Sequence, residues 1–185
     1  MTNRWILQAA FLLGFLSIAL SINYEILERR QSSTNSECLE LLEQLDGQLC
    51  LGHRINFKIP MEVKRLGQME RKDAVIFIRE MLQNIFNVFK NDSSSTGWNK
   101  KIVESFLGKL NDQIHFLNEV LEEVPQNERW TPSNFPTILR LKSYYGRLQS
   151  FLEVKGYSSC AWMVVRAEIL KNFSIIRRLT NTFQN

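Results

Sequence analysis

Apolar residues recur every three or four positions through five long stretches of the chain. The clearest stripe lies in residues 99–123 and consists of Val103, Phe106, Leu107, Leu110, Ile114, Leu117 and Leu121. This spacing puts side chains on one face of an α-helix, which turns once every ~3.6 residues. The same period predicts helices over residues 24–45, 71–90, 137–154 and 158–182, and no stretch shows the alternation typical of a strand. The predicted fold class is all-α.

The links between these predicted helices suggest how they are connected in space. Three of the links are short, which favours antiparallel neighbours. They are the polar run "NDSSSTGW", a segment with Pro125, Pro132 and Pro136, and "KGYSS". We expect the proline-containing segment to be extended. Residues 46–70 are long enough to cover the ~30 Å length of a 20-residue helix, so the first two helices can run parallel. We expect a five-helix cytokine bundle with a long overhand connection between its first two helices.

The first 21 residues have the features of a secretory signal peptide. Arg4 precedes an apolar run, and "ALS" at residues 19–21 is a small-x-small pattern typical of a cleavage site. The alternative is a membrane anchor, but the run from Trp5 to Leu20 contains Gln8 and is shorter than the ~20 apolar residues of a span. We expect residues 1–21 to be removed and residues 22–185 to form a secreted helical domain without membrane insertion.

Composition and charge agree with a single globular domain. The chain has 185 residues, of which 44% are hydrophobic and 23% charged, with 8 Gly and 4 Pro. Its formal net charge of +4, which becomes +3 without Arg4, is only mildly basic. This balance gives no indication of nucleic-acid binding.

The three cysteines predict one disulfide and one free thiol, because secretion favours disulfide formation. Cys38 lies within the apolar stripe of the first helix, where a buried cysteine acts as a small hydrophobic residue. Cys50 follows the "DG" turn, and Cys160 begins the last helix. We therefore predict a Cys50–Cys160 disulfide with Cys38 free, since the alternative Cys38–Cys160 bridge would draw a residue out of a packed stripe.

Motifs for catalysis or metal binding are scarce. The chain has two histidines and no G-x-S-x-G, H-E-x-x-H, C-x-x-C or phosphate-binding glycine loop. Cys50 and His53 have the spacing of half a metal site, which is weak support for zinc. We expect no enzymatic activity, no metal and no cofactor.

Two N-x-S/T sequons, at Asn91 and Asn172, could carry N-linked glycans in a secreted protein. Asn91 lies in the polar run after the second helix, so we expect a glycan there. Asn172 lies within the last helix, near its apolar face, so we expect little or no glycan at that site.

The last predicted helix has two different faces. At ~100° per residue, its core stripe consists of Trp162, Val165, Ile169, Phe173 and Ile176. A second stripe points away from the core and consists of Met163, Ala167, Lys171, Ser174 and Arg178, flanked by Arg166 and Leu170. Such a mixed face is either solvated with a few stray apolar residues or a protein-binding surface. The predicted disulfide would bring Leu51 and Arg54 close to it.

The stretch "YYGRLQSFLEVKGYSSCAW", residues 144–162, resembles the signature of the type I interferon family, with paired aromatic residues, a small-residue turn and a final Cys-Ala-Trp. The stretches "VVRAEIL", "EMLQNIFNVF" and "DSSSTGWN" extend the resemblance along the chain. It implies a secreted five-helix cytokine that joins both chains of the heterodimeric type I interferon receptor. Their associated Janus kinases then signal antiviral, antiproliferative and immune responses. The family disulfide corresponds to Cys50–Cys160.

The resemblance also implies two receptor contacts. The high-affinity receptor chain is bound by the first connection and the last helix, at positions that here are Leu51, Arg54, Arg166, Ala167, Leu170, Lys171 and Ile175. The low-affinity chain is bound by the middle helices, at positions that here are Phe86, Asn87 and Lys142. Spacing in the helix predicted over residues 71–90 also suits Phe86 to a surface contact, because Phe86 neighbours the core residue Ile85 but points away from the apolar stripe of that helix. We expect a monomer.

Two other functions use different parts of the sequence. A carrier or glycosaminoglycan-binding protein would bind its ligand through basic residues, and that binding would depend steeply on salt. The candidate residues are Lys100, Lys101, Arg177 and Arg178. A secreted enzyme with an unrecognised site would use His53 or His115 for acid–base chemistry. The whole-chain resemblance favours the cytokine.

Overall fold

The structure is a computed structural model that describes residues 22–184 except 48–49, 51–54, 66–68 and 91–95. The described residues form no strand and these helices: α2 (Tyr24–Gln44), η2 (Glu62–Lys64), α3 (Arg71–Phe89), α4 (Lys100–Glu122), α5 (Gln126–Arg129), α6 (Phe135–Val154), α7 (Ser159–Asn181) and η5 (Thr182–Gln184). The five long helices agree with the five predicted ones to within two residues at each end. The predicted signal peptide lies outside the described residues.

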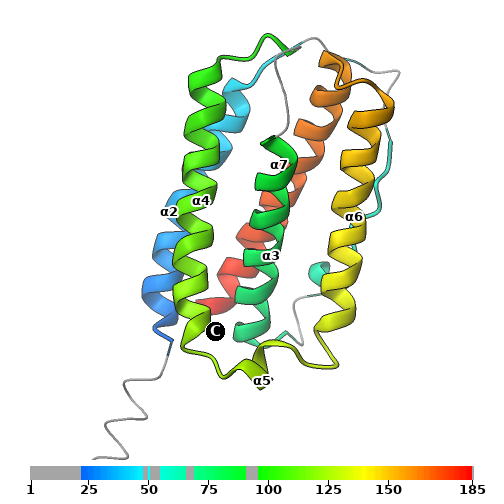
Figure 1. Ribbon diagram of the computed structural model, residues 1–185. Coiled ribbons are helices and arrows are strands. Elements are labelled where there is room, and N and C mark those ends of the chain that lie inside the picture. The colour runs from blue at the N-terminus through cyan, green and yellow to red at the C-terminus, as the bar shows by residue number, and fades with distance from the viewer. Residues whose placement is uncertain (1–21, 48–49, 51–54, 66–68, 91–95, 185) are drawn as a thin grey trace, which may run out of the picture.

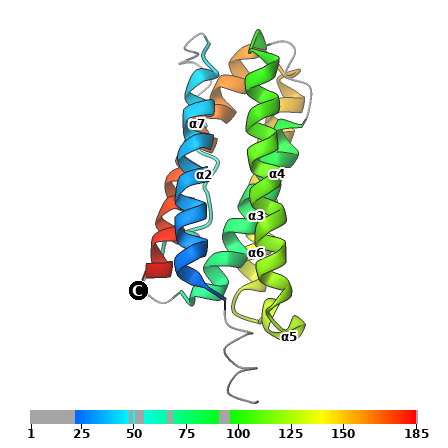
Figure 2. The same ribbon diagram turned by 90° about the vertical axis from the view of Figure 1, so that its left-hand side faces the viewer.

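The five long helices form one bundle in which α2 and α3 run parallel (Figure 1). The longest described stretch of their connection, residues 55–65, lies along the bundle, as expected for an overhand connection. α3 is central and contacts α4, α6 and α7, whereas α2 contacts α4 and α7. Figure 2 shows α2 and α7 on one side of the bundle and α3 and α4 on the other.

One predicted neighbour relationship is wrong. α4 and α6 run antiparallel, as their link suggested, but α3 lies between them (Figure 1). The link includes α5 at the lower end of the bundle, and it is long enough to pass around the end of α3. Residues 126–129 are also helical and not extended, because Pro125 stands at the N-cap of α5, where a missing N–H costs little.

The central position of α3 explains why more of it is buried than one stripe. Val75, Ile76 and Leu82 point to other sides of the helix and are buried. The residues of its apolar stripe are buried as well: Ala74, Phe77, Ile78, Met81, Ile85, Val88 and Phe89. A helix that is apolar around most of its circumference packs between several neighbours. α3 therefore forms the core on which the outer helices are arranged.

Side chains at the helix starts define where the helices begin. Asn23, Asn99 and Ser158 precede α2, α4 and α7, and each accepts a hydrogen bond from a backbone N–H of the first turn. Pro136 lies in the first turn of α6, where its fixed backbone angle suits a helix. This explains why α6 begins before the predicted residue 137.

The cysteines adopt the predicted arrangement. Cys50 and Cys160 form a disulfide with their Cα atoms 5.4 Å apart, and Cys38 is free and fully buried. The bridge closes a separation of 110 residues, which stabilises the fold by about 4–5 kcal/mol in the chain-entropy account. Burial raises the pKa of the Cys38 thiol from 9.0 to about 12, so the thiol stays protonated and unreactive at neutral pH.

Candidate functional site

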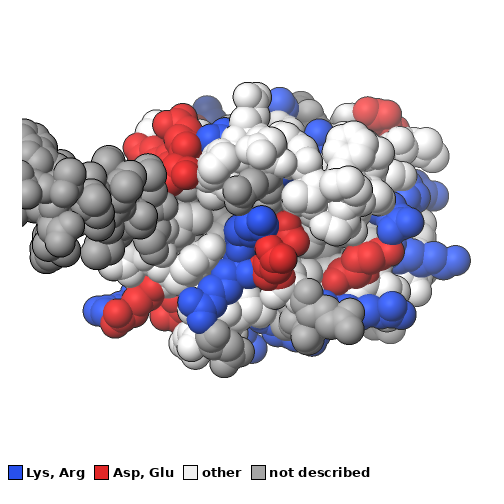
Figure 3. Space-filling model, turned by 90° about the horizontal axis from the view of Figure 1, so that it is seen from below, with Lys and Arg blue, Asp and Glu red and all other residues white. Residues whose placement is uncertain are grey.

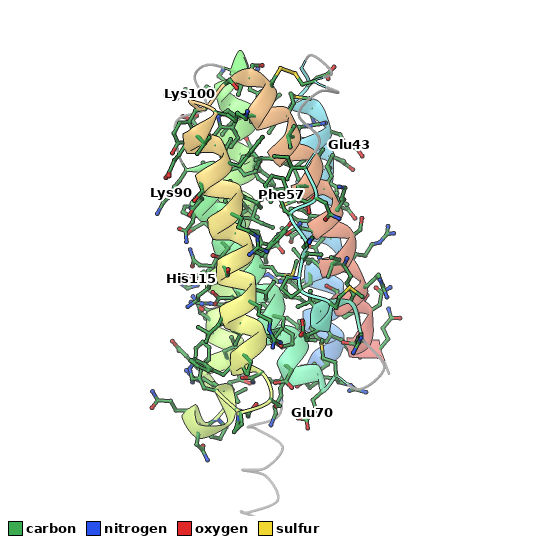
Figure 4. All side chains as sticks on the ribbon, turned by 90° about the vertical axis from the view of Figure 1, so that its right-hand side faces the viewer. Glu43, Phe57, Glu70, Lys90, Lys100 and His115 are labelled. Carbon is green, nitrogen blue, oxygen red and sulfur yellow. A yellow bond between two sulfur atoms is a disulfide. The ribbon has the colours of Figure 1, made fainter. Side chains whose placement is uncertain are left out.

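The outer side of α7 and the connection of residues 55–65 form one surface. Figure 4 shows the connection, with Phe57, lying between α6 and α7. A groove of about 680 Å³ separates the connection from α7 and is lined by Ile55, Asn56, Ile59, Lys64, Glu168, Lys171, Asn172 and Ile175. Ala167 and Lys171 are exposed, and Arg166 and Leu170 are half-buried. We call this the α7 surface; the other two predicted residues, Leu51 and Arg54, lie outside the described residues.

Arg166 holds the end of α2. Its Nε donates a hydrogen bond to the Leu42 carbonyl at 2.7 Å, and its Nη2 donates to the Glu43 carbonyl at 3.0 Å. The last carbonyls of a helix have no partner within the helix and carry partial negative charge. α2 has no basic residue in its own last turn, so Arg166 of α7 supplies the positive charge. Arg166 therefore joins α2 to the α7 surface.

Lys171 is tied to a buried polar network between α6 and α7. Its Nζ lies 2.9 Å from Oε2 of Glu168, a carboxylate that is only 7% exposed. The Tyr144 hydroxyl donates to Glu168 Oε1 at 3.0 Å and accepts from Asn172 Nδ2 at 2.7 Å. Asn172 Oδ1 in turn accepts from the Tyr145 hydroxyl. Because buried polar groups keep their geometry when all are bonded, this network holds Glu168 in place, and the exposed Lys171 pairs with it at the rim of the groove.

Two predicted positions on α7, Ile175 and Asn172, are enclosed in the fold. Ile175 was expected to face a partner, but it is only 7% exposed and lines the wall of the groove. The connection of residues 55–65 covers this flank of α7, which a helical wheel cannot show. Asn172 is 1% exposed and bonded on both sides of its amide, so the folded chain has no room for a glycan there. Asn91 lies outside the described residues.

A second surface lies on α3 and α6, and we call it the α3 surface. Phe86 and Asn87 are half-buried on α3, and Lys142 is exposed on α6. The Lys142 Nζ lies 3.7 Å from Oε1 of Glu80, a carboxylate that is 4% exposed and also accepts from Asn84 Nδ2 at 3.1 Å. Each surface thus has an exposed lysine held by a buried carboxylate.

The two surfaces face away from each other. α3 and α7 are in contact through their inner sides, so their outer sides point in opposite directions (Figure 2). Those of the predicted residues that the structure describes therefore form two separate groups, one on each side of the bundle. The carboxylates beneath them were missed by the sequence analysis, although a single glutamate inside an apolar stretch, as at Glu168 in "VVRAEIL", could have indicated them.

The basic residues of the glycosaminoglycan alternative do not form one cluster. Lys100 and Lys101 begin α4 at the upper end of the bundle, whereas Arg177 and Arg178 lie near the end of α7 at the lower end (Figure 1). Seen from below, basic and acidic side chains are interspersed (Figure 3). This arrangement does not provide a continuous cationic surface from those four residues.

The catalytic and metal alternatives also receive little support. His115 is exposed, and its Nδ1 lies 3.3 Å from Glu119 on the same helix. Cys50 is in a disulfide, which removes it as a thiolate ligand. No group of three or more His, Cys, Asp or Glu residues in the described part of the chain could hold a metal ion. Within the same residues, no helix is both long and apolar enough to cross a membrane.

Comparisons with known proteins identify the family. The Interferon alpha/beta domain family matches residues 27–183, and the chain is 54% identical to interferon beta of Mus musculus and 50% to that of Homo sapiens, each alignment covering 100% of both chains. The chain belongs to the interferon alpha/beta family. Type I interferons are cytokines and not enzymes.

Solved structures of fish interferons share the fold. Zebrafish interferon 2 is 27% identical with a TM-score of 0.67, and the match covers 78% of this chain and 96% of that chain. Zebrafish interferon 1, at 20% identity, has a TM-score of 0.71 over 82% of this chain and 95% of that chain, which supports the fold alone. The type I interferon fold is thus the five-helix cytokine bundle expected from the sequence.

Proposed function

We propose that this type I interferon is a secreted monomer that joins the two chains of the type I interferon receptor. The observation that carries the proposal is the placement of two separate surfaces on opposite sides of one bundle. A single rigid chain with two such surfaces can hold two receptor chains close together without any chemical reaction. The kinases bound to those chains then start the antiviral, antiproliferative and immune response.

The high-affinity receptor chain binds the α7 surface in this proposal. Leu170 provides an apolar contact, and Lys171 provides a charge at the rim of the groove. Anchors of this kind, partly desolvated and held in place before binding, carry most of the energy of an interface. Arg166 and Ile175 act mainly by holding α2 and the groove in shape, while Leu51 and Arg54 extend the contact.

The low-affinity receptor chain binds the α3 surface. Phe86 packs partly against the core and leaves part of its ring accessible, which suits an apolar contact of limited area. Lys142, held by Glu80, and the Asn87 amide supply polar contacts. In this proposal the weaker contact rests on one partly accessible aromatic ring with polar neighbours.

Export and processing complete the proposal. Residues 1–21 direct secretion and are removed, leaving the domain of residues 22–185. The Cys50–Cys160 disulfide is compatible with an oxidising compartment, where such bonds persist. A glycan on Asn91 accompanies secretion.

Binding of purified receptor ectodomains tests the two-surface proposal. A Leu170→Ala, Lys171→Ala double variant should weaken binding to the high-affinity chain at least ~tenfold, or about 1.4 kcal/mol, and leave the low-affinity chain unaffected. Phe86→Ala should do the reverse. Leu139→Ala, which truncates an exposed side chain on α6 outside the α7 surface, is the control for the high-affinity chain. If both sets of changes weakened the same receptor chain, the two-surface proposal would be wrong.

A further inference from the structure

The connection between α2 and α3 is fastened to α6 at two places: Arg140 of α6 pairs with Glu62 at 2.6 Å, and a second set of contacts surrounds Phe57. Phe57 is 5% exposed and packs edge-on against Phe151, with ring centroids 5.5 Å apart. Arg147 Nη2 donates hydrogen bonds to the Phe57 carbonyl at 3.0 Å and the Lys58 carbonyl at 3.4 Å. These contacts hold the connection between α6 and α7 and leave a groove on each side of it.

The groove on the α6 side differs from the one on the α7 side. It has a volume of about 730 Å³ and is lined by Ile55, Asn56, Phe57, Lys58, Arg147, Ser150, Phe151, Val154 and Lys155. The described residues of its lining include the three cations Lys58, Arg147 and Lys155 and no carboxylate. By contrast, the α7-side groove contains Glu168. We call the α6-side groove the cationic groove.

Apolar side chains in the cationic groove are unusually open to solvent. Val154 is 82% exposed, the largest exposed fraction among the large hydrophobic residues that are described, and Ile55 is 47% exposed. Exposed apolar groups beside unpaired charge are typical of a surface that a partner covers. The Lys58 and Lys155 ammonium groups form no ion pair with a described carboxylate, so they are available to a partner's anions.

We propose that the cationic groove binds an acidic segment of the high-affinity receptor chain that also carries apolar side chains. The carboxylates of this segment would meet Lys58 and Lys155, and its apolar side chains would cover Val154 and Ile55. Ile55 and Asn56 line both grooves, so a receptor chain on the α7 surface needs only to cross the connection to reach α6. The inference rests on the proposed function, and it extends the contact of the high-affinity receptor chain from the α7 surface to the cationic groove.

Charge complementarity gives the proposal a kinetic signature. Lysines at the edge of an interface mainly accelerate association, and salt screens that effect. A Lys58→Glu, Lys155→Glu variant should therefore bind the high-affinity ectodomain with a lower association rate, by about tenfold or more at low salt. The difference from the unaltered protein should shrink as salt is added.

Val154→Asp tests the apolar part of the groove, with Leu139→Asp as the control on the same helix. Leu139 is 50% exposed and lies outside the lining of the groove. Leu139→Asp therefore makes the same kind of chemical change as Val154→Asp, but away from the groove. We expect Val154→Asp to raise the dissociation constant for the high-affinity ectodomain about tenfold and Leu139→Asp to leave it unchanged. Both variants should keep the melting temperature of the unaltered protein, because both side chains are exposed.

The outcomes separate this inference from the proposed function. If the unaltered protein fails to bind the high-affinity ectodomain, the proposed function itself is wrong. If Leu170→Ala, Lys171→Ala weakens binding but Val154→Asp and the charge reversals do not, only the cationic groove is excluded. If Val154→Asp instead abolishes self-association in sedimentation while receptor affinity is unchanged, the groove binds a second copy and the inference is overturned.

Discussion

The Tyr145 hydroxyl on α6 donates a 2.5 Å hydrogen bond to the amide oxygen of Asn172 on α7, and neither side chain is more than 1% exposed. Tyr145→Phe removes the donor and leaves the buried amide oxygen without it. Stability should fall by about 1–3 kcal/mol, which urea unfolding will measure. Tyr24→Phe is the control, since the Tyr24 hydroxyl has no hydrogen-bond partner among the described residues. Equal stability of the two variants would mean that the buried bond contributes nothing.

Arg166→Ala should both destabilise the fold and weaken receptor binding. The variant loses two charge-assisted hydrogen bonds to the end of α2, for an expected cost of about 1–3 kcal/mol. Arg166→Lys should rescue little, because a lysine cannot reproduce the forked donor geometry. Hydrogen exchange should accelerate at the last turn of α2. A loss of affinity without faster exchange would make Arg166 a direct receptor contact instead.

The Cys38 thiol should make the protein less stable in alkali. Burial raises its pKa to about 12 in the folded chain, against 9.0 for an ordinary thiol. The folded state therefore keeps a proton that the unfolded state releases, and stability present below pH 9.0 is lost as pH rises towards 12. Over that range the slope should approach about 1.4 kcal/mol per pH unit for this group.

Cys38→Ala isolates this contribution, because Tyr144 and Tyr145 also have pKa values raised by burial and add to the alkaline loss. Unfolding free energies measured between pH 8 and 10.5 should fall less steeply in the variant than in the unaltered protein. Parallel curves would show that the thiol is not shielded as the structure indicates.

Gln31→Leu should stabilise the protein. Gln31 is fully buried on α2, and neither polar atom of its side chain has a hydrogen-bond partner among the described residues. A leucine of similar size removes the cost of that burial, for a gain of about 1 kcal/mol in thermal or urea unfolding. Gln44→Leu on the exposed end of α2 should have almost no effect. A loss of stability in Gln31→Leu would show that an internal water satisfies the amide.

Glycan analysis distinguishes the two sequons. Protein secreted from mammalian cells should lose mass on glycosidase treatment, and Asn91→Gln should abolish that loss. Glycosylation should be unchanged in Asn172→Gln, because Asn172 is enclosed by Tyr144, Tyr145 and Glu168. A glycan at Asn172 would require the last helix to be accessible when it is modified, before folding is complete.

Most of the fold could be predicted because it depends on local rules. Apolar residues at helical spacing identify five helices, and the length of the first connection permits the parallel run of the first two. The central position of α3 could not be predicted, since helical period gives the direction of a face but not which neighbours cover it. The long link through α5 permits several arrangements.

The candidate site was predictable only in part for a similar reason. Spacing separates Trp162 and Ile169, which are fully buried, from Ala167 and Lys171, which are exposed. Ile175 entered the receptor contact through the resemblance, and its enclosure by residues more than a hundred positions earlier in the chain could not be read from spacing within α7. The roles of Arg166 and Glu168 depend on carbonyls of α2 and a hydroxyl of α6 that no pattern within α7 can indicate.

The capping of α2 by Arg166 has a practical consequence for recognition by antibodies. A synthetic peptide of residues 159–181 would contain every α7 residue of the surface but neither the Leu42 and Glu43 carbonyls nor Tyr144. Its arginine and lysine would move freely, and their arrangement would be lost. Antibodies that neutralise the protein through this surface should therefore recognise a discontinuous epitope, and they should fail to stain the reduced, denatured chain.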